Sequence, residues 1–127
     1  MVDQFLRFLK KTYNIPGKRV DLESVLRDYE IDLSKLSENG SSLLNLIIME
    51  EDLDSLKMVL KPPDGFKTKG ADPNLVDKKL GWSPIVASIN QSPTGYQEGI
   101  YELLRAKADP NFEVEKMTPI MWAARSN

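Results

Sequence analysis

A tetrapeptide that occurs twice constrains the fold of this chain more than any other feature. The sequence Ala-Asp-Pro-Asn occupies residues 71–74 and returns at residues 108–111, 37 positions further on. A second element recurs at a similar spacing. It is a hydroxyl residue followed by proline or an aliphatic run, and it lies at 42–44, 83–85 and 118–120. Self-similarity with a period of about 20 to 50 residues is typical of repeat architectures, in which each unit buries its apolar face against the next. We therefore expect a stack of similar units.

The second element is a helix start with a physical basis. Ser83 is suited to accept a hydrogen bond from a backbone N–H at the N-cap, and Pro84 then occupies the first helical position, where its missing N–H costs nothing. The same pair of residue types returns as Thr-Pro at 118–119. The spacing of the apolar residues predicts two short helices after the start at Ser83, over about 83–90 and 97–107.

These motifs resemble the ankyrin repeat, whose pattern joins Gly-Ala-Asp-Pro-Asn in a hairpin to Gly-x-Thr-Pro-Leu-His-x-Ala at the first helix. The resemblance implies an all-α solenoid of stacked helix-turn-helix pairs, with short β-hairpin loops along one edge. Gly40 and Gly81 are expected to bend these loops, since glycine adopts positive φ without penalty. The resemblance is carried by residues 70–74, 81–85, 101–104, 108–111 and 118–124, with a fainter copy at 31–34 and 40–42.

The repeat spacing divides the chain into four units. Residues 1–33 form a degenerate N-terminal capping repeat, 34–70 a repeat with an inserted loop at 61–69, 71–107 a second repeat and 108–127 a partial C-terminal repeat. An unrelated helix packed on the end of the stack is the alternative for the first part of the cap, because terminal repeats are atypical. The last unit stops before its second helix, so we expect missing repeats or a second chain to cover its apolar end.

The chain departs from the family pattern at identifiable positions. The histidine of the first helix is replaced by Asn45, Val86 and Met121, so its hydrogen bonding to neighbouring loops is expected to be lost. The insertion at 61–69 and the lengthened turn at 92–95 are polar or rich in Pro and Gly, which predicts surface loops.

The composition argues against catalysis within this chain. There is no Cys and no His, which removes disulfides, thiolate and imidazole metal ligands, cysteine nucleophiles and histidine general bases. Phosphate-binding glycine loops and nucleophile elbows are also missing from the sequence. We expect no cofactor, no metal and no catalytic residue. The acidic run 50–54 is interpreted as a charged turn at a helix N-terminus, and Asp72 and Asn74 as loop residues that bond their own backbone.

Charge and hydropathy narrow the class of partner. The chain has 17 Lys and Arg against 19 Asp and Glu, a net charge of −2 that is spread evenly, so no nucleic-acid partner is expected. The longest apolar run, 43–49, is far shorter than the roughly 20 residues of a membrane span, and we expect no membrane association. The N-terminus does not match a secretory signal, and the expected location is cytoplasmic.

The candidate binding surface is a stripe along the hairpin tips. Ser41, Trp82 and Met117 occupy equivalent positions before successive helix starts, and this position points outward in the ankyrin repeats that the chain resembles. Aromatic residues and Met are enriched in interface cores. The alternative for Trp82 is that it packs on the neighbouring hairpin and helps to stack the repeats. The complete expected partner-binding set is Ser41, Met49, Lys79, Leu80, Trp82, Asn90, Met117 and Arg125.

The resemblance implies a protein–protein interaction module, a scaffold or adaptor that binds another protein through the hairpin tips and the concave helix face. Rigid stacked helices hold such a surface in place, so little entropy is lost on binding. The alternative is a substrate-recruiting arm of a larger enzyme or effector whose catalytic domain lies outside this chain. The partner is a protein in both hypotheses, and its identity is not encoded in the motifs.

Overall fold

The computed structural model describes residues 7–9, 11–12, 21–91 and 95–109 of the chain. Residues 7–9 and 11–12 are helical, and none of the described residues belongs to a strand. The fold class is all-α, as the repeat pattern predicts. The helices that follow are α2 (Leu22–Asp28), α3 (Leu43–Met49), α4 (Leu53–Leu60), α5 (Pro84–Ile89) and α6 (Gln97–Arg105).

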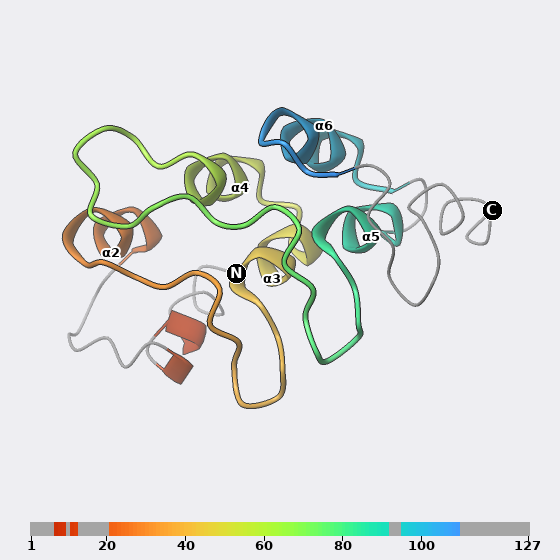
Figure 1. Cartoon of the computed structure of the whole chain (residues 1–127), viewed down its shortest axis with the longest axis horizontal. Coiled ribbons are helices and arrows are strands. Elements are labelled where there is room, and N and C mark those ends of the chain that lie inside the picture. Colours follow the sequence, from red (N-terminus) through yellow and green to blue (C-terminus); the bar gives the residue numbers. More distant parts are fainter. Residues whose placement is uncertain (1–6, 10, 13–20, 92–94, 110–127) are drawn as a thin grey trace.

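The helices stand in two rows (Figure 1). α3 packs on α4 and α5 packs on α6, which makes two helix pairs, and contacts of α3 with α5 and of α4 with α6 stack one pair on the other. We call α3 and α5 the inner row. α2 packs on α4 and extends the outer row of α4 and α6. The loops that precede α3 and α5 project from the inner side, so the molecule is a short helical solenoid with a looped edge.

The helix starts follow the local chemistry of the sequence. The hydroxyl groups of Ser42 and Ser83 accept hydrogen bonds from the backbone N–H groups of Asn45 and Val86, at 3.0 and 3.3 Å. Pro84 occupies the first turn of α5, where a missing N–H costs nothing. The predicted N-cap and the predicted helix after it are both confirmed in this repeat.

The acidic run 50–54 also behaves as its composition predicts. Asp52 is the N-cap of α4, and its carboxylate accepts from the backbone N–H of Ser55 at 3.1 Å. Asp54 lies in the first turn, where a negative charge is favoured by the helix dipole. The run is therefore a capped turn between the two helices of one pair.

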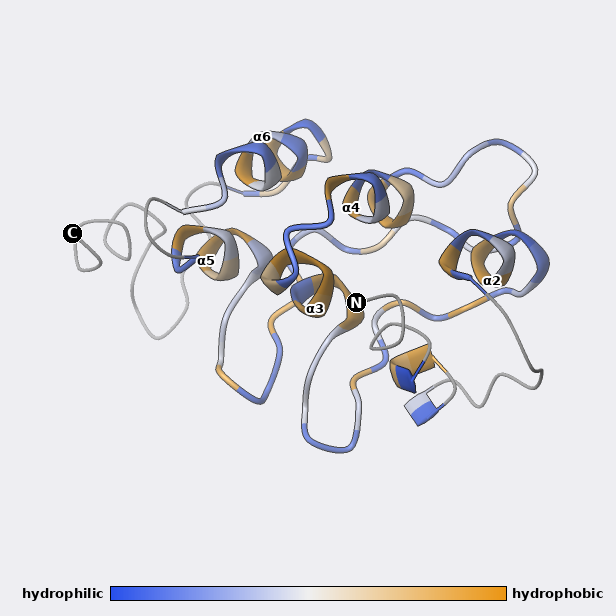
Figure 2. Cartoon of the chain, turned by 180° about the vertical axis from the view of Figure 1, so that it is seen from behind, coloured by the Kyte–Doolittle hydropathy of each residue, from blue (hydrophilic) through white to orange (hydrophobic). Residues whose placement is uncertain are grey.

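The apolar core lies between the two rows. α3 contributes most to it and is orange over most of its length in Figure 2, where apolar residues are orange. Burying each large side chain of this kind contributes roughly 1.5–3 kcal/mol to stability. The buried side chains at the centre of the core are Leu43, Leu44, Ile47 and Ile48 from α3, Leu56 and Val59 from α4, and Leu103 from α6.

The projecting loops are hairpin-shaped and are closed by turn hydrogen bonds. Gly40 and Gly81 have φ values of 85° and 72°, which confirms that glycine bends both loops. In the second loop the backbone N–H of Asp77 donates to the carbonyl of Trp82 at 3.0 Å. The backbone N–H of Lys78 donates to the carbonyl of Gly40 at 2.8 Å, so consecutive loops are also tied to each other.

Asn45 corrects one expectation from the sequence. Its side-chain Nδ2 donates a hydrogen bond of 3.1 Å to the backbone carbonyl of Trp82 in the next hairpin loop. The expectation that a histidine replacement removes bonding to the neighbouring loop is wrong at this position, because an amide also reaches that carbonyl. Val86 is buried and apolar, and Met121 lies outside the described residues.

The insertion at 61–69 is more firmly attached than a simple surface loop. Most of it is exposed, but Thr68 is buried. The backbone N–H of Thr68 donates to the carbonyl of Leu26 at 3.0 Å, and that of Lys67 donates to the carbonyl of Arg27 at 3.2 Å. Because the last carbonyls of a helix lack partners within it, these bonds make the insertion a cap for the end of α2.

The tetrapeptide that defines the repeat is itself part of the stacking contact. The side-chain Oδ1 of Asn74 accepts a hydrogen bond of 2.9 Å from the backbone N–H of Asp109 in the next copy. Asp72 accepts from the backbone N–H of Asn74 at 2.9 Å, as expected for a loop residue that bonds its own backbone. The division of the chain into four units stays a prediction, and most of the last unit, 110–127, lies outside the described residues.

Candidate binding surface

The expected partner-binding residues do not all have the same surroundings. Ser41 and Lys79, from consecutive hairpin loops, line the same pocket. Met49 and Leu80 are exposed large apolar side chains, with 48% and 41% of their surface accessible. Two further members of the set lie outside the described residues, Met117 and Arg125.

Trp82 and Asn90 are both engaged by their own repeat. The Trp82 side chain is half-buried and packs against the core, and its backbone N–H donates to Oδ1 of Asp77 at 3.1 Å. Asn90 is the C-cap of α5, and its Nδ2 donates to the carbonyl of Val86 at 2.9 Å. These contacts give both residues a structural role, and their contact with a partner stays a prediction.

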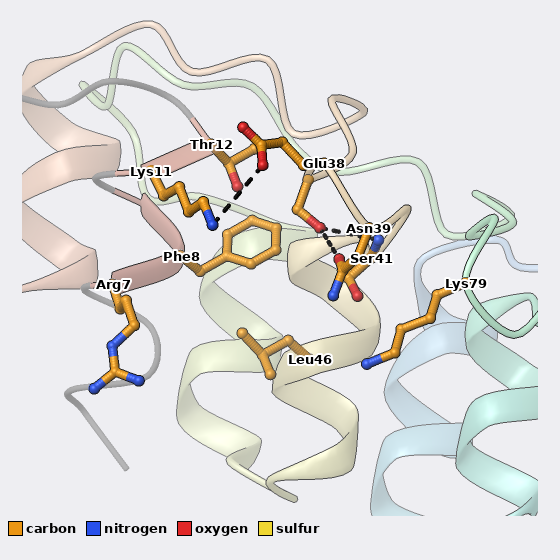
Figure 3. Close-up of a pocket in the computed structure, with 10 residues that line it drawn as sticks. Arg7, Phe8, Lys11, Thr12, Glu38, Asn39, Ser41, Leu46 and Lys79 are labelled. Atoms are coloured by element: carbon orange, nitrogen blue, oxygen red, sulfur yellow. Dashed lines mark hydrogen bonds and ion pairs between the residues drawn. The ribbon is translucent and has the colours of Figure 1, made fainter.

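A pocket of about 340 Å³ lies where the N-terminal helical residues, α3 and the hairpin loops meet (Figure 3). Phe8 and Leu46 form its apolar floor, and Phe8 also packs against the core. The remaining lining residues are polar or charged and surround this floor. They are Arg7, Lys11, Thr12, Ser37, Glu38, Asn39, Ser41 and Lys79.

The helical period of α3 explains why Leu46 faces the pocket. Residues three and four apart lie on one face of a helix, so Leu46 shares a face with Met49 and Glu50. These three are half-buried or exposed, whereas the neighbouring positions 43–45 and 47–48 are buried. The outward face of α3 therefore carries both an observed pocket residue and a predicted contact residue.

The hairpin side of the pocket is held by short-range hydrogen bonds. The hydroxyl group of Ser37 donates to the side-chain oxygen of Asn39, and the same hydroxyl accepts from the backbone N–H of Ser41 at 3.1 Å. The backbone N–H of Ser37 donates to the carbonyl of Ser41 at 2.9 Å. These bonds fix the loop that carries Glu38 and present its side chains to the pocket.

Among the described residues that line the pocket, cations outnumber carboxylates. Arg7, Lys11 and Lys79 are cationic, and Glu38 is the one acidic residue of this described set. Lys11 Nζ lies 3.9 Å from Glu38 Oε2, and both side chains are largely exposed, so this ion pair contributes little to stability. The rim is thus locally positive on a chain whose net charge is −2.

The second pocket, of about 440 Å³, lies between the loops 30–34 and 69–72. Two of its carboxylates, those of Asp32 and Asp72, accept hydrogen bonds from the loops that carry them. Asp32 accepts hydrogen bonds from the hydroxyl and the backbone N–H of Ser34, and these bonds hold the pKa of Asp32 below its ordinary value. Among the described residues, no group of acidic side chains is arranged to hold a metal ion.

Sequence reasoning missed the N-terminal side of this surface. Arg7, Phe8 and Lys11 were not among the expected contact residues, because the cap has no repeat motif that fixes its register on α3. Leu46 was also missed, although it carries a signal. It is an apolar residue on the outward face of α3, opposite the positions whose periodicity places them in the core.

Comparison with solved structures agrees with this geometry. The chain is similar to an ankyrin repeat domain from Acinetobacter baumannii AYE, with a TM-score of 0.61 and 22% sequence identity. The match covers 76% of this chain and 46% of that domain, so the chain spans less than half of the length of the domain. The two rows of helices define a helical repeat protein, and the particular fold is that of the ankyrin repeat.

No protein-family model matches the chain, and no curated protein is significantly similar to it. Within the described residues, no helix has the length and apolar character needed to cross a bilayer.

Proposed function

We propose that the chain is a scaffold or adaptor that binds a partner protein through its hairpin loops and the outward face of α3. The observation that carries this proposal is the pocket framed by two consecutive loops, α3 and the N-terminal helical residues. The ankyrin-repeat fold of the similar structure supports a binding role in general. Binding is the activity in this proposal, and no catalytic step is assigned to the chain.

The loops are suited to binding because they are fixed before a partner arrives. Hydrogen bonds tie neighbouring repeats together. The backbone N–H of Lys78 donates to the Gly40 carbonyl and Asn45 Nδ2 donates to the Trp82 carbonyl, and one repeat further on the backbone N–H of Asp109 donates to Asn74 Oδ1. A surface that is already ordered loses little conformational entropy on association. The loops therefore offer a preformed surface for a partner.

Exposed apolar side chains supply the binding energy in this proposal. Met49 lies on the outward face of α3, and Leu80 lies in the hairpin loop that precedes α5. About half of each side chain is already covered, so burying the remainder contributes roughly half of the 1.5–3 kcal/mol that full burial gives, and interface energy is concentrated in a few residues of this kind. We therefore expect Met49 and Leu80 to act as anchors.

Selection of ligands from a random peptide display library against the folded chain tests the proposal. The chain offers a matched pair of variants, each of which removes two exposed apolar side chains from one face. Met49→Ser with Leu80→Ser changes the proposed surface, and Tyr101→Ser with Leu104→Ser changes the outer helix α6, where these residues are 61% and 44% exposed. Circular dichroism of both variants first establishes that each retains the parent fold.

The selected ligands should lose binding to the Met49→Ser, Leu80→Ser variant by about tenfold, since the two lost anchors together cost roughly 1.5 kcal/mol. Binding to the α6 variant should be unchanged. Failure to select any ligand of the folded chain contradicts the proposal, as does loss of binding only in the α6 variant.

A further inference from the structure

We propose that the pocket beside Phe8 and Leu46 binds an acidic segment of a partner protein, with one large apolar side chain on the floor and carboxylates against the cationic rim. This inference rests on the proposed function and specifies the chemistry of the partner segment. It concerns a part of the surface that the repeat motifs do not mark, because Arg7, Phe8 and Lys11 come from the N-terminal helical residues.

The floor is shaped for an apolar anchor. Phe8 and Leu46 are both half-buried, so each presents part of an apolar side chain to the pocket. The volume of about 340 Å³ is at the small end of the roughly 300–1,000 Å³ typical of binding cavities. It suits one side chain of a partner and the backbone on either side of it.

The rim selects a negatively charged segment around that anchor. Figure 3 shows Lys11 and Lys79 on opposite sides of Phe8, with the Lys79 side chain extending toward Leu46. Arg7 and Lys79 form no ion pair with any residue in the described part of the chain. Two cations that form no ion pair with another described residue thus border an apolar floor.

Carboxylates on both sides of the anchor complement this arrangement. The pairing is sensitive to salt, because all three cations are exposed and their interactions are screened within about 10 Å at 0.1 M ionic strength. The side-chain amide of Asn39, whose oxygen is held by the Ser37 hydroxyl, offers a further hydrogen bond to an extended backbone.

A protein segment fits this surface better than a nucleic acid. Recognition of a phosphate backbone requires a track of cations, whereas this rim includes Glu38 and an apolar floor. The acidic turn 50–54 follows α3 directly and repels a continuous polyanion that runs along the helix. Discrete carboxylates around one apolar side chain avoid that repulsion.

Fluorescence anisotropy with synthetic peptides tests the inference on the full chain. The probe is a short labelled peptide with a central phenylalanine flanked by glutamates. One matched peptide has glutamine in place of the glutamates, another has serine in place of the phenylalanine, and a labelled oligothymidylate serves as a polyanion without the anchor. The acidic anchored peptide should bind about tenfold more tightly than either matched peptide, and its affinity should fall as salt is added.

Two triple variants locate the binding site. Arg7→Gln, Lys11→Gln and Lys79→Gln remove the rim cations, and Lys61→Gln, Lys67→Gln and Lys69→Gln remove the same charge from the exposed insertion loop. We expect the rim variant to weaken binding about tenfold, because each exposed pair contributes up to about fivefold, and the loop variant to have little effect.

Several outcomes overturn the inference. They are equal binding of the acidic and glutamine peptides, equal weakening by both triple variants, and tighter binding of the oligothymidylate than of the peptide. Library ligands that lose binding to the rim variant but contain no acidic residues also overturn it, while the proposed function stands. If the library yields no ligand at all, the proposed function itself fails.

Discussion

Thr68 gives the sharpest test of how the insertion 61–69 is held on the fold. Its side chain is only 2% exposed, and Oγ1 accepts a hydrogen bond of 3.0 Å from the backbone N–H of Ile31. The same hydroxyl donates to the carbonyl of Tyr29. Thr68→Val keeps the shape and β-branching of the side chain and removes both bonds, so it isolates the contribution of the hydroxyl.

The expected loss follows from what the substitution leaves unpaired. A buried polar group without its partner costs about 1–3 kcal/mol. The N–H of Ile31 is in a buried residue and bears this cost in full, whereas Tyr29 is half-exposed and water offsets part of it. The free energy of unfolding of Thr68→Val should therefore fall by about 2–4 kcal/mol. Thr68→Ser keeps the hydroxyl, loses one methyl group and should cost only about 1 kcal/mol.

Urea denaturation followed by circular dichroism measures both variants against the parent chain. The predicted order of stability is parent, then Thr68→Ser, then Thr68→Val, with similar slopes of free energy against urea. If Thr68→Val is as stable as Thr68→Ser, the side chain acts through packing alone, and the argument that the hydroxyl secures the insertion is refuted.

Three further perturbations test other parts of the fold. Asn45→Ala removes the bond to the Trp82 carbonyl, which keeps its bond from the Asp77 N–H, and should lower the free energy of unfolding by about 0.5–1.5 kcal/mol; a melting temperature equal to that of the parent would show that the link contributes nothing. Gly40→Ala places a Cβ 2.9 Å from the backbone nitrogen of Lys79 at a φ of +85°, so urea denaturation should show a loss of more than about 1 kcal/mol, and an unchanged midpoint would contradict a fixed loop tip. Burial raises the pKa of Tyr96 from its ordinary 10.0 to about 12, so the folded state retains a proton that the unfolded state releases. This contribution to stability is complete below pH 10 and is lost as the pH rises to about 12, and melting curves over that range should show a smaller fall for Tyr96→Phe than for the parent.

The features that were predicted from the sequence depend on residues close together in the chain. Ser83 and Pro84 specify a helix start because the N-cap bond spans three residues. Gly40 bends its loop because of its own backbone freedom, and Asp72 bonds a backbone N–H two residues away. The repeat motif also predicts one long-range feature, which is that successive units stack in register. This stacking brings Ser41 and Lys79 to one pocket.

The features that were missed depend on contacts between distant residues without a repeated motif. Thr68 meets Tyr29 across 39 residues, and Asn45 meets Trp82 across 37. The composition of the insertion correctly predicts a surface loop. It does not indicate that the loop lies against the end of α2, because that contact depends on residues far apart in the sequence. The N-terminal half of the pocket was missed for the same reason, since Phe8 belongs to a segment with no motif to set its register.

A footprint of a bound ligand tests the central claim most directly. Backbone amide chemical shifts of the isotope-labelled chain are recorded with and without a peptide selected from the display library. We predict that the shifts change in the loops 37–41 and 77–82 and along α3, and that α4 and α6 are little affected. Changes that are concentrated on α4 and α6, with the loops unaffected, would contradict it.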